Sequence, residues 1–162
     1  MSLITVDYGT VTGGGSKRSP MVYAKSSSAY TSAWYIDFAM NNDGSTTMTT
    51  YSAWIAQSNN VGEWVKFTFD DETEGEKVNK ISFYTKAVSG SWTINFRIQG
   101  SNVDSTWTDV SSKTVIATNT QTKSEYSFDN STAYKYYRIY FDSAIQASGS
   151  NYVMFAGFKL YY

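Results

Sequence analysis

The sequence predicts an all-β protein, a jelly-roll sandwich of about eight antiparallel strands with one short helix. Aromatic residues make up 17% of the chain, and they fit pleated sheets well. Leucine, a strong helix former, occurs only at Leu3 and Leu160. Several short segments also alternate apolar and polar side chains and are separated by turn residues at hairpin-like spacing. These three observations together favour a β-sandwich.

The clearest alternation begins at Trp92, where the chain reads W-T-I-N-F-R-I-Q-G-S-N-V-D-S-T-W-T-D. One face of residues 92–99 is apolar and the other polar, which indicates a half-buried strand. Turn residues follow at 100–105, and Trp107 opens the return. Residues 33–40 are expected to form one or two helical turns, because Trp34 and Phe38 fall on one side. Further strands are expected at residues 3–12, 63–69, 78–86, 114–117, 124–128, 134–141 and 152–162.

The domain organisation predicted is an N-terminal strand or arm with a glycine-rich connector at residues 1–19, followed by one sandwich domain at 20–162. The run from Gly13 to Gly15 makes the connector flexible. An alternating arm with free edge groups is suited to pairing with a neighbouring chain, so an oligomer could form through it. The alternative is an ordinary edge strand of the same domain, which is the commoner arrangement in small domains.

Composition and charge exclude several classes of function. The 162-residue chain has no cysteine and no histidine, so thiolate chemistry and the commonest general base are both missing. Its net charge of -1 gives no attraction for nucleic acid or anionic lipid. No apolar run is long enough to span a membrane. We also recognise no secretory signal after Met1.

Catalysis is not expected. The carboxylates at 70–74 lie in a charged turn, where no desolvation would separate the pKa of an acid from that of a base. The glycines at 13–15 lack the Lys-Ser/Thr pair and the helix of a phosphate-binding loop. The protein is therefore predicted to be a non-enzyme.

Five motifs, in order and spacing, resemble the discoidin family, also called the coagulation-factor type C domain, of the galactose-binding-like fold. They are S-A-W at 52–54, G-E-W-V-K-F-T-F at 62–69, F-R-I-Q-G-S-N-V-D-S-T-W-T at 96–108, Y-K-Y-Y-R-I-Y-F at 134–141 and F-K-L-Y-Y at 158–162. The most specific pair is the G-S-N turn with its later Trp-Thr, followed by Y-Y-R-I. The resemblance covers roughly residues 20–162.

The resemblance implies a non-catalytic module that binds carbohydrate, or phospholipid in animal proteins, through loops at one end of the sandwich. Related modules occur on bacterial secreted enzymes and on phage structural proteins. We therefore expect a glycan-binding module displayed on a virion or extracellular surface for attachment. The alternative is a structural or decoration protein of a phage particle that docks through its N-terminal arm onto other virion proteins.

The candidate ligand-binding residues are aromatic or planar polar side chains, which suit the apolar face and the hydroxyls of a sugar ring. Most lie on loops that the family pattern brings to one end, and Arg97 lies on the polar face of its strand. Each could instead serve packing, because large aromatic residues are mostly buried. The candidates are Tyr30, Tyr35, Asn41, Trp54, Trp92, Arg97 and Tyr152.

Other aromatic and basic residues are assigned to the structural framework. Trp64 has apolar neighbours in its strand and is expected in the core. Trp107 is expected to pack over the sandwich edge. Tyr136, Tyr137, Arg138 and Tyr140 lie on one central strand, where structural roles are the default.

No cofactor is required by the sequence, and calcium is the one metal for which the resemblance suggests ligands. Asp37, Asn42 and Asp43 offer the oxygen ligands that calcium prefers. The family's acidic residue in the last strand is matched here by Gly157, which weighs against the site. In the G-S-N turn, Val103-Asp104 replaces the family's Asp-Gly. Asp tolerates the left-handed conformation, so we expect the turn to be kept.

Overall fold

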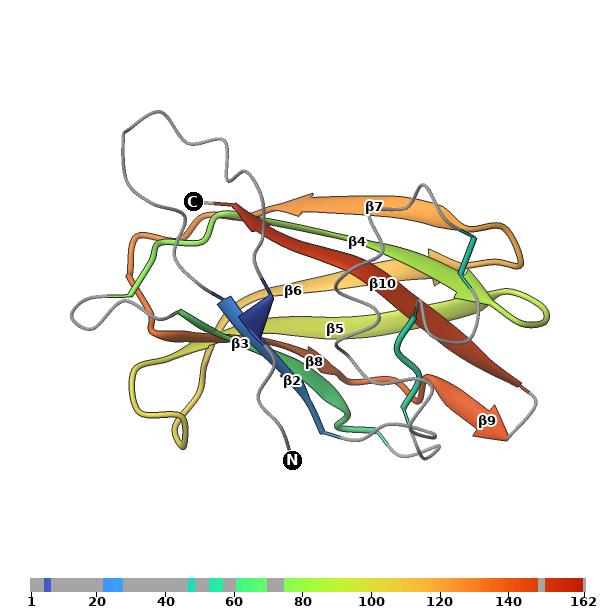
Figure 1. The fold of residues 1–162 in the computed structure, drawn as a ribbon, viewed down its shortest axis with the longest axis horizontal. Helices are drawn as coiled ribbons and strands as arrows, with labels where there is room; N and C mark the ends of the chain where they lie inside the picture. The colour runs from blue at the N-terminus through green and yellow to red at the C-terminus, as the bar shows by residue number, and fades with distance from the viewer. Residues whose placement is uncertain are drawn as a thin grey trace.

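The computed structural model describes residues 5–6, 22–27, 47–48, 53–56, 61–69, 75–148 and 151–161. These residues form ten β-strands in two antiparallel sheets (Figure 1). The strands are β1 (Thr5–Val6), β2 (Val22–Ser26), β3 (Trp64–Phe69), β4 (Lys80–Ala87), β5 (Trp92–Ser101), β6 (Thr108–Ala117), β7 (Thr122–Ser127), β8 (Tyr136–Phe141), β9 (Gln146–Ser148) and β10 (Asn151–Tyr161). The larger sheet has the order β1-β2-β3-β8-β5-β6, and the smaller has β7-β4-β10-β9.

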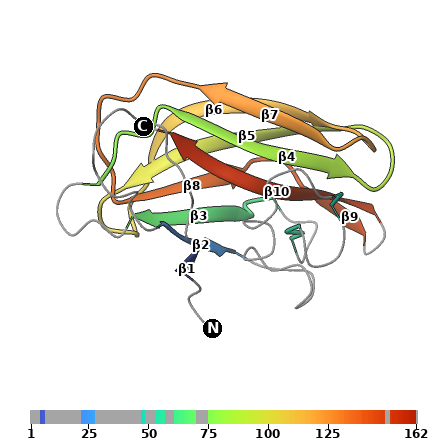
Figure 2. The same cartoon turned by 45° about the horizontal axis from the view of Figure 1, so that its top comes forward.

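The two sheets pack face to face and enclose one aromatic core (Figure 2). In β3 and β8 every second residue is buried, which is the period-two pattern of strands with one face inward. Phe83 on the smaller sheet packs edge-on against Phe96 on the larger, with ring centroids 5.6 Å apart. Phe141 on the larger sheet and Phe155 on the smaller sheet pack with tilted rings, with centroids 4.8 Å apart. The all-β sandwich prediction is confirmed.

Strand β5 lies between β8 and β6, and its polar side chains lie on the outer face of the sheet. Its inward residues Ile94, Phe96 and Ile98 are buried, as the alternation in the sequence predicts. A register shift between Ile98 and Gln99 in the pairing with β6 marks an irregularity there. Opposite Gln99 the partners are Asp109 on β6 and Arg138 on β8. The outer face of this sheet is therefore polar and charged at its centre.

The turn between β5 and β6 keeps its shape without the family's glycine. Asp104 adopts a positive φ of 57°, the left-handed conformation that the sequence predicted for it. The Ser101 hydroxyl accepts hydrogen bonds from the Val103 and Asp104 amides, at 3.2 and 3.0 Å. The Asp104 carboxylate also pairs with Lys66 on β3, at 2.5 Å. The turn is thus attached to the outer face of the larger sheet.

Most of the expected strands are present, and the differences have local causes. β6 begins at Thr108, earlier than expected, because its first half has a single apolar residue, Val110, and lacks an apolar alternation. β2 and the three-residue β9 were not predicted. β1 pairs with β2 at the sheet edge, and the division of the chain after residue 19 stays a prediction. The expected helical segment 33–40 lies outside the described residues, which contain no helix and hence none that could cross a membrane.

Candidate functional site

Three connections meet at one end of the sandwich, which we call the loop end: residues 88–91, 118–121 and 151–152. The Ala87 amide donates to the Thr118 carbonyl at 2.7 Å. The Val88 amide donates to the Tyr152 carbonyl at 3.0 Å. These bonds hold the β4–β5 connection between the two sheets, the β6–β7 turn and the start of β10 together (Figure 1). The loop end is therefore a rigid platform made from both sheets.

Trp92 is the large aromatic residue that this platform orients. It opens β5 opposite Ala117 and is half-buried. Its indole Nε1 donates a hydrogen bond to the Ser89 carbonyl at 3.1 Å. Ser89 is held in turn by its hydroxyl, which donates to Asn151 Oδ1 at 2.8 Å. The polar edge of the indole is thus satisfied within the protein, and part of the ring stays exposed.

Tyr152, a second predicted residue, belongs to the same end. It is half-buried and packs against the core, while its backbone carbonyl accepts the Val88 amide. The neighbouring Val153 amide donates to the Ile145 carbonyl at 2.9 Å, which fixes the start of β10 to the segment after β8. The structure therefore brings Trp92 and Tyr152 to one end, as the sequence predicted.

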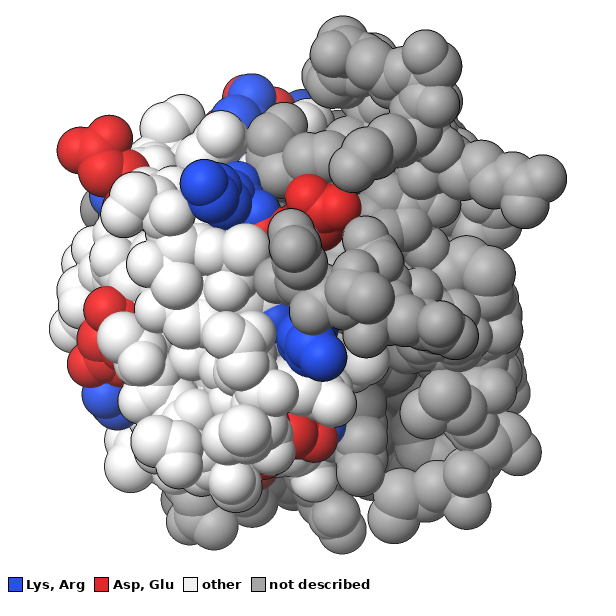
Figure 3. Space-filling model, turned by 90° about the vertical axis from the view of Figure 1, so that its left-hand side faces the viewer, with Lys and Arg blue, Asp and Glu red and all other residues white. Residues whose placement is uncertain are grey.

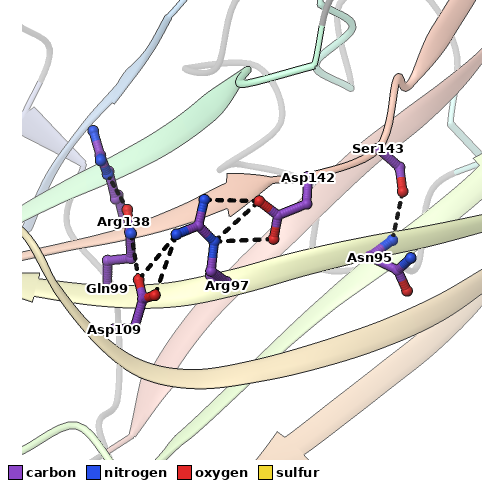
Figure 4. A network of polar contacts seen from close by, with 7 residues as sticks. All are labelled: Asn95, Arg97, Gln99, Asp109, Arg138, Asp142 and Ser143. Carbon is purple, nitrogen blue, oxygen red and sulfur yellow. Dashed lines mark hydrogen bonds and ion pairs between the residues drawn. The ribbon is translucent and has the colours of Figure 1, made fainter.

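Arg97 lies elsewhere, on the outer face of β5, and its guanidinium is occupied by two carboxylates (Figure 4). Nε is 3.0 Å from both Asp142 oxygens, and Nη2 is 2.8 Å from Asp142 Oδ1. Nη1 is 3.2 Å from Asp109 Oδ2. Trp92 has the parity of the inward residues Ile94 and Phe96, so Arg97 faces the opposite side of the strand. The structure does not place Arg97 with Trp92.

The two carboxylates fix the charge state of Arg97. The hydrogen bonds that Arg97 donates to Asp142 and Asp109 raise the pKa of Arg97. The pKa of Asp109 is lowered, first by the hydrogen bond from Gln99 Nε2 at 2.5 Å and then by Arg97. Arg97 and Asp109 therefore both stay ionised at neutral pH. A guanidinium this fully paired orients its neighbours and has little left to offer a ligand.

The burial of two tryptophans differs from the burial predicted for them. Trp54, predicted to contact a ligand, is fully buried, and its ring centroid is 5.9 Å from those of Phe141 and Phe155. Its backbone pairs with Phe155. Trp54 is a core residue with no exposed ring face for a sugar, so that prediction is wrong. Trp64, expected in the core, is half-buried on the outer face of β3, because its neighbour Val65 takes the inward position.

The remaining candidates lie outside the described residues: Tyr30, Tyr35 and Asn41 for ligand binding, and Asp37, Asn42 and Asp43 for calcium. Gly157 has a positive φ of 60° at a register shift in β10, between Ala156 and Lys159. Glycine adopts this conformation without strain. Among the described residues no group of three acidic side chains is placed to hold a metal. The calcium site stays a prediction.

The opposite end of the sandwich, with the β5–β6 turn and the C-terminus, shows interspersed charges. In Figure 3, basic and acidic side chains of the described part lie close to one another over this end. Lys66 with Asp104 is one such pair, and Lys80 with Glu125 is another, at 2.9 Å. This mixed surface agrees with the net charge of -1.

Sequence reasoning missed Asp109, Asp142 and Gln99, the partners of Arg97 and Arg138. Asp109 is 12 residues from Arg97 and Asp142 is 45 residues away. One signal could have found Asp109: in a hairpin, Arg97 and Asp109 fall near each other across the turn. Asp142 carries no such local signal.

A family model described as the F5/8 type C domain matches residues 23–158. The chain belongs to the F5/8 type C domain family. No significant match is found among curated proteins. The family assignment therefore rests on the family model, and the solved structures below support the fold.

Solved structures that share the fold of this F5/8 type C domain include modules from two bacterial sources. A Clostridium perfringens module, CpGH89CBM32-5, solved with GalNAc-β-1,3-galactose, has 13% identity and a TM-score of 0.61 over 87% of this chain and 95% of that chain. The family 32 module of C. perfringens NanJ, solved with galactose, has 16% identity and a TM-score of 0.56 over 85% and 93%. Chitosan-binding module 1 from a Paenibacillus sp. IK-5 chitosanase/glucanase has 19% identity and a TM-score of 0.57 over 86% and 93%.

Proposed function

We propose that this F5/8 type C domain is a non-catalytic carbohydrate-binding module that takes its sugar at the loop end. The structural neighbours solved with galactose and GalNAc-β-1,3-galactose are carbohydrate-binding modules of the same fold. Their identities of 13% and 16% mean that ligand identity does not transfer from them. The proposal rests instead on residues of this chain.

The observation that carries the proposal is the indole of Trp92, which is fixed by a hydrogen bond, packs against the core and stays partly exposed. Its Nε1 already donates a hydrogen bond to the Ser89 carbonyl. A ligand that covers the ring therefore leaves no buried donor without an acceptor. The hydrogen bonds through Ser89 and Asn151 hold the ring before any ligand arrives. Preorganisation of this kind lowers the entropy cost of binding. An aromatic face of this sort stacks against the C–H face of a pyranose.

The proposal includes the location of the module. We place the module on a virion or extracellular surface, where it attaches the parent particle or protein to a glycan. A module that only binds needs no catalytic group, which agrees with the absence of histidine and cysteine from the sequence. The parent assembly would supply avidity when several copies bind together.

The second candidate is a structural or decoration protein that docks through its N-terminal arm. The observation that favours it is β1, a two-residue strand at the edge of the larger sheet that pairs only with β2 among the described strands. An edge strand held by so few bonds is suited to exchange with a neighbouring chain. Deleting residues 1–15 separates the candidates, since assembly is lost under the second and glycan binding is kept under the first.

A glycan array run with and without calcium tests the first candidate. We expect binding to at least one glycan by the wild-type protein, and loss of that signal in Trp92→Ala. The matched control is Tyr84→Ala, which removes a half-buried aromatic side chain from β4 on the smaller sheet, outside both proposed sites. An array without any signal under both conditions, from a folded protein, would reject the first candidate.

A further inference from the structure

The outer face of the larger sheet carries a set of aromatic and basic side chains that the core does not use. A sandwich buries only its inner faces, yet these six residues are all half-buried on the outside. We call them the outer-face cluster. They come from β3, β8 and the β5–β6 turn, and they are Trp64, Lys66, Trp107, Tyr136, Arg138 and Tyr140.

Cations and rings are in contact throughout the outer-face cluster. Lys66 Nζ lies 5.9 Å from the ring centroid of Trp64 and 5.7 Å from that of Tyr136. The Arg138 guanidinium lies 4.2 Å from the Trp107 ring and 5.0 Å from the Tyr140 ring. Such contacts orient the cations and cover the ring faces only in part.

The basic groups on this face differ in what they pair with. Lys66 forms an ion pair with Asp104, and Arg97 forms ion pairs with Asp109 and Asp142. The side chain of Arg138 makes one hydrogen bond to a described residue, from Nε to Gln99 Oε1 at 2.6 Å. The two terminal nitrogens of Arg138 have no acceptor in the part of the chain that the structure describes.

Gln99 is the reason that the hydrogen-bond acceptor of Arg138 is a neutral amide and not a carboxylate. Its amide nitrogen donates to Asp109, so its oxygen faces Arg138 as a neutral acceptor. Asp109, the nearest carboxylate along this chain of bonds, is engaged by Gln99 and Arg97. Burial lowers the pKa of Arg138, in contrast to Arg97, whose pKa the carboxylates raise. The Arg138 guanidinium is thus held in place by Gln99, and its two terminal nitrogens donate no hydrogen bond to a described residue.

We propose that the outer-face cluster is a second saccharide site for a sugar bearing a carboxylate, a uronic acid residue, with Arg138 binding the carboxylate. This proposal rests on the proposed function, because it assumes that the ligand is a saccharide. The second site lies away from the loop end. A guanidinium presents two parallel N–H groups that match a carboxylate. The neighbouring rings supply apolar surface for the pyranose. Asp104 and Asp109 would repel an anion if they were free, but Asp104 is paired with Lys66, and Asp109 is paired with Arg97, which it shares with Asp142.

The test is a nuclear magnetic resonance titration that reads the two sites separately. The wild-type protein and Trp92→Ala are titrated with trigalacturonate, and with galactotriose as the neutral match. We expect trigalacturonate to shift the Arg138 Nε–H and the Trp107 indole signals in both proteins. Arg138→Lys keeps the charge and loses the fork, so its affinity should fall roughly tenfold or more. Lys86→Gln, on the smaller sheet, removes one positive charge outside the outer-face cluster and should change nothing, which controls for net charge.

Each outcome decides between the two proposals. Shifts at Trp92 alone would overturn the second site and leave the loop-end proposal standing. Equal shifts at Arg138 with galactotriose would overturn its preference for a carboxylate. No shift at any signal with either sugar would overturn the second site, and the glycan array then decides the first separately. If Arg138→Lys fails to fold, the wild-type shift map still settles the location.

Discussion

Arg97 and Asp142 lie 45 residues apart in the sequence and form a two-nitrogen contact on the outer face of the larger sheet. The contact fastens the residue after β8 to the centre of β5. Beside it, the Asn95 carbonyl accepts the Asp142 amide at 2.9 Å, and the Ser143 hydroxyl accepts the Asn95 amide at 2.9 Å (Figure 4). This segment leads to Ile145, whose carbonyl holds Val153 beside Tyr152. Arg97 is therefore a positioning residue for the loop end.

Arg97→Ala should lower the free energy of unfolding and loosen the segment after β8. Both groups of the pair are about one-third exposed, so we expect a loss of about 1 kcal/mol. Amide hydrogen exchange should rise at residues 142–145. Lys123→Ala breaks an exposed pair with Glu125 and is the control, with a cost near zero. Urea unfolding measures both variants, and equal costs would contradict the positioning role.

Gly100→Ala should be destabilising because a Cβ at this position would lie 2.3 Å from Tyr134 Cδ2. The Tyr134 ring cannot move away easily, since it packs edge-on against Tyr137 at 5.6 Å and its backbone exchanges two hydrogen bonds with Glu76. Overpacking of this kind costs about 1–3 kcal/mol. Tyr134→Ala removes the obstacle, so Gly100→Ala should cost less in that background. Thermal melts of the four proteins give the comparison, and purely additive costs would refute the clash.

The two tryptophans Trp54 and Trp92 should separate stability from binding. Trp54→Ala opens a cavity between Phe141 and Phe155 and should cost about 3–5 kcal/mol. Trp92 is half-buried, so Trp92→Ala should cost less than about 2 kcal/mol. Denaturant unfolding of both variants checks the order. A larger cost at Trp92 than at Trp54 would show that the core assignment is wrong.

Tyr137 should make the protein sensitive to alkaline pH. Its hydroxyl donates to the Glu76 carbonyl at 2.7 Å and accepts from Asn130 Nδ2 at 2.8 Å. Burial raises the pKa of Tyr137 to about 12. The unfolded chain releases this proton near pH 10 and the folded protein retains it. Stability is therefore complete below about pH 10 and falls as the pH rises toward about 12.

Tyr137→Phe should flatten that alkaline fall while lowering stability at neutral pH, because it removes the hydroxyl and its hydrogen bonds. Burial also raises the pKa of Tyr126, so a small alkaline slope should remain. Unfolding free energies measured at steps between pH 9 and 12 give the slope for each protein. An unchanged slope in Tyr137→Phe would assign the alkaline sensitivity to other groups.

The strands were predictable because their signal is local. The alternation at Ile94, Phe96 and Ile98 reports a buried face within one strand. The turn at Asp104 was predictable for the same reason, since its conformation depends on a few neighbouring residues. The length of β6 was underestimated, because the start of the strand has a single apolar residue, Val110, and no alternation.

The roles of the tryptophans were not predictable, because they depend on distant pairing. Trp54 and Trp92 both follow polar loops in the sequence. Only the bridge between Trp54 and Phe155, about a hundred positions further on, puts the first ring in the core. Trp92 lies at the edge of the sandwich, because it is the first residue of β5 and pairs with Ala117, the last residue of β6. A sequence pattern shows which residues alternate. It does not show which distant segments pack against the end of a strand.

The most direct test of the central claim is the affinity of the wild-type protein and of Trp92→Ala for the same glycan, the strongest one on the array. Calorimetric titration gives both dissociation constants, and thermal melting shows whether both proteins are folded. Stacking on an aromatic ring contributes about 1–3 kcal/mol in related sugar and base contacts. We therefore predict an affinity loss of roughly tenfold or more in a folded variant. Unchanged affinity in folded Trp92→Ala would contradict a saccharide site at the loop end.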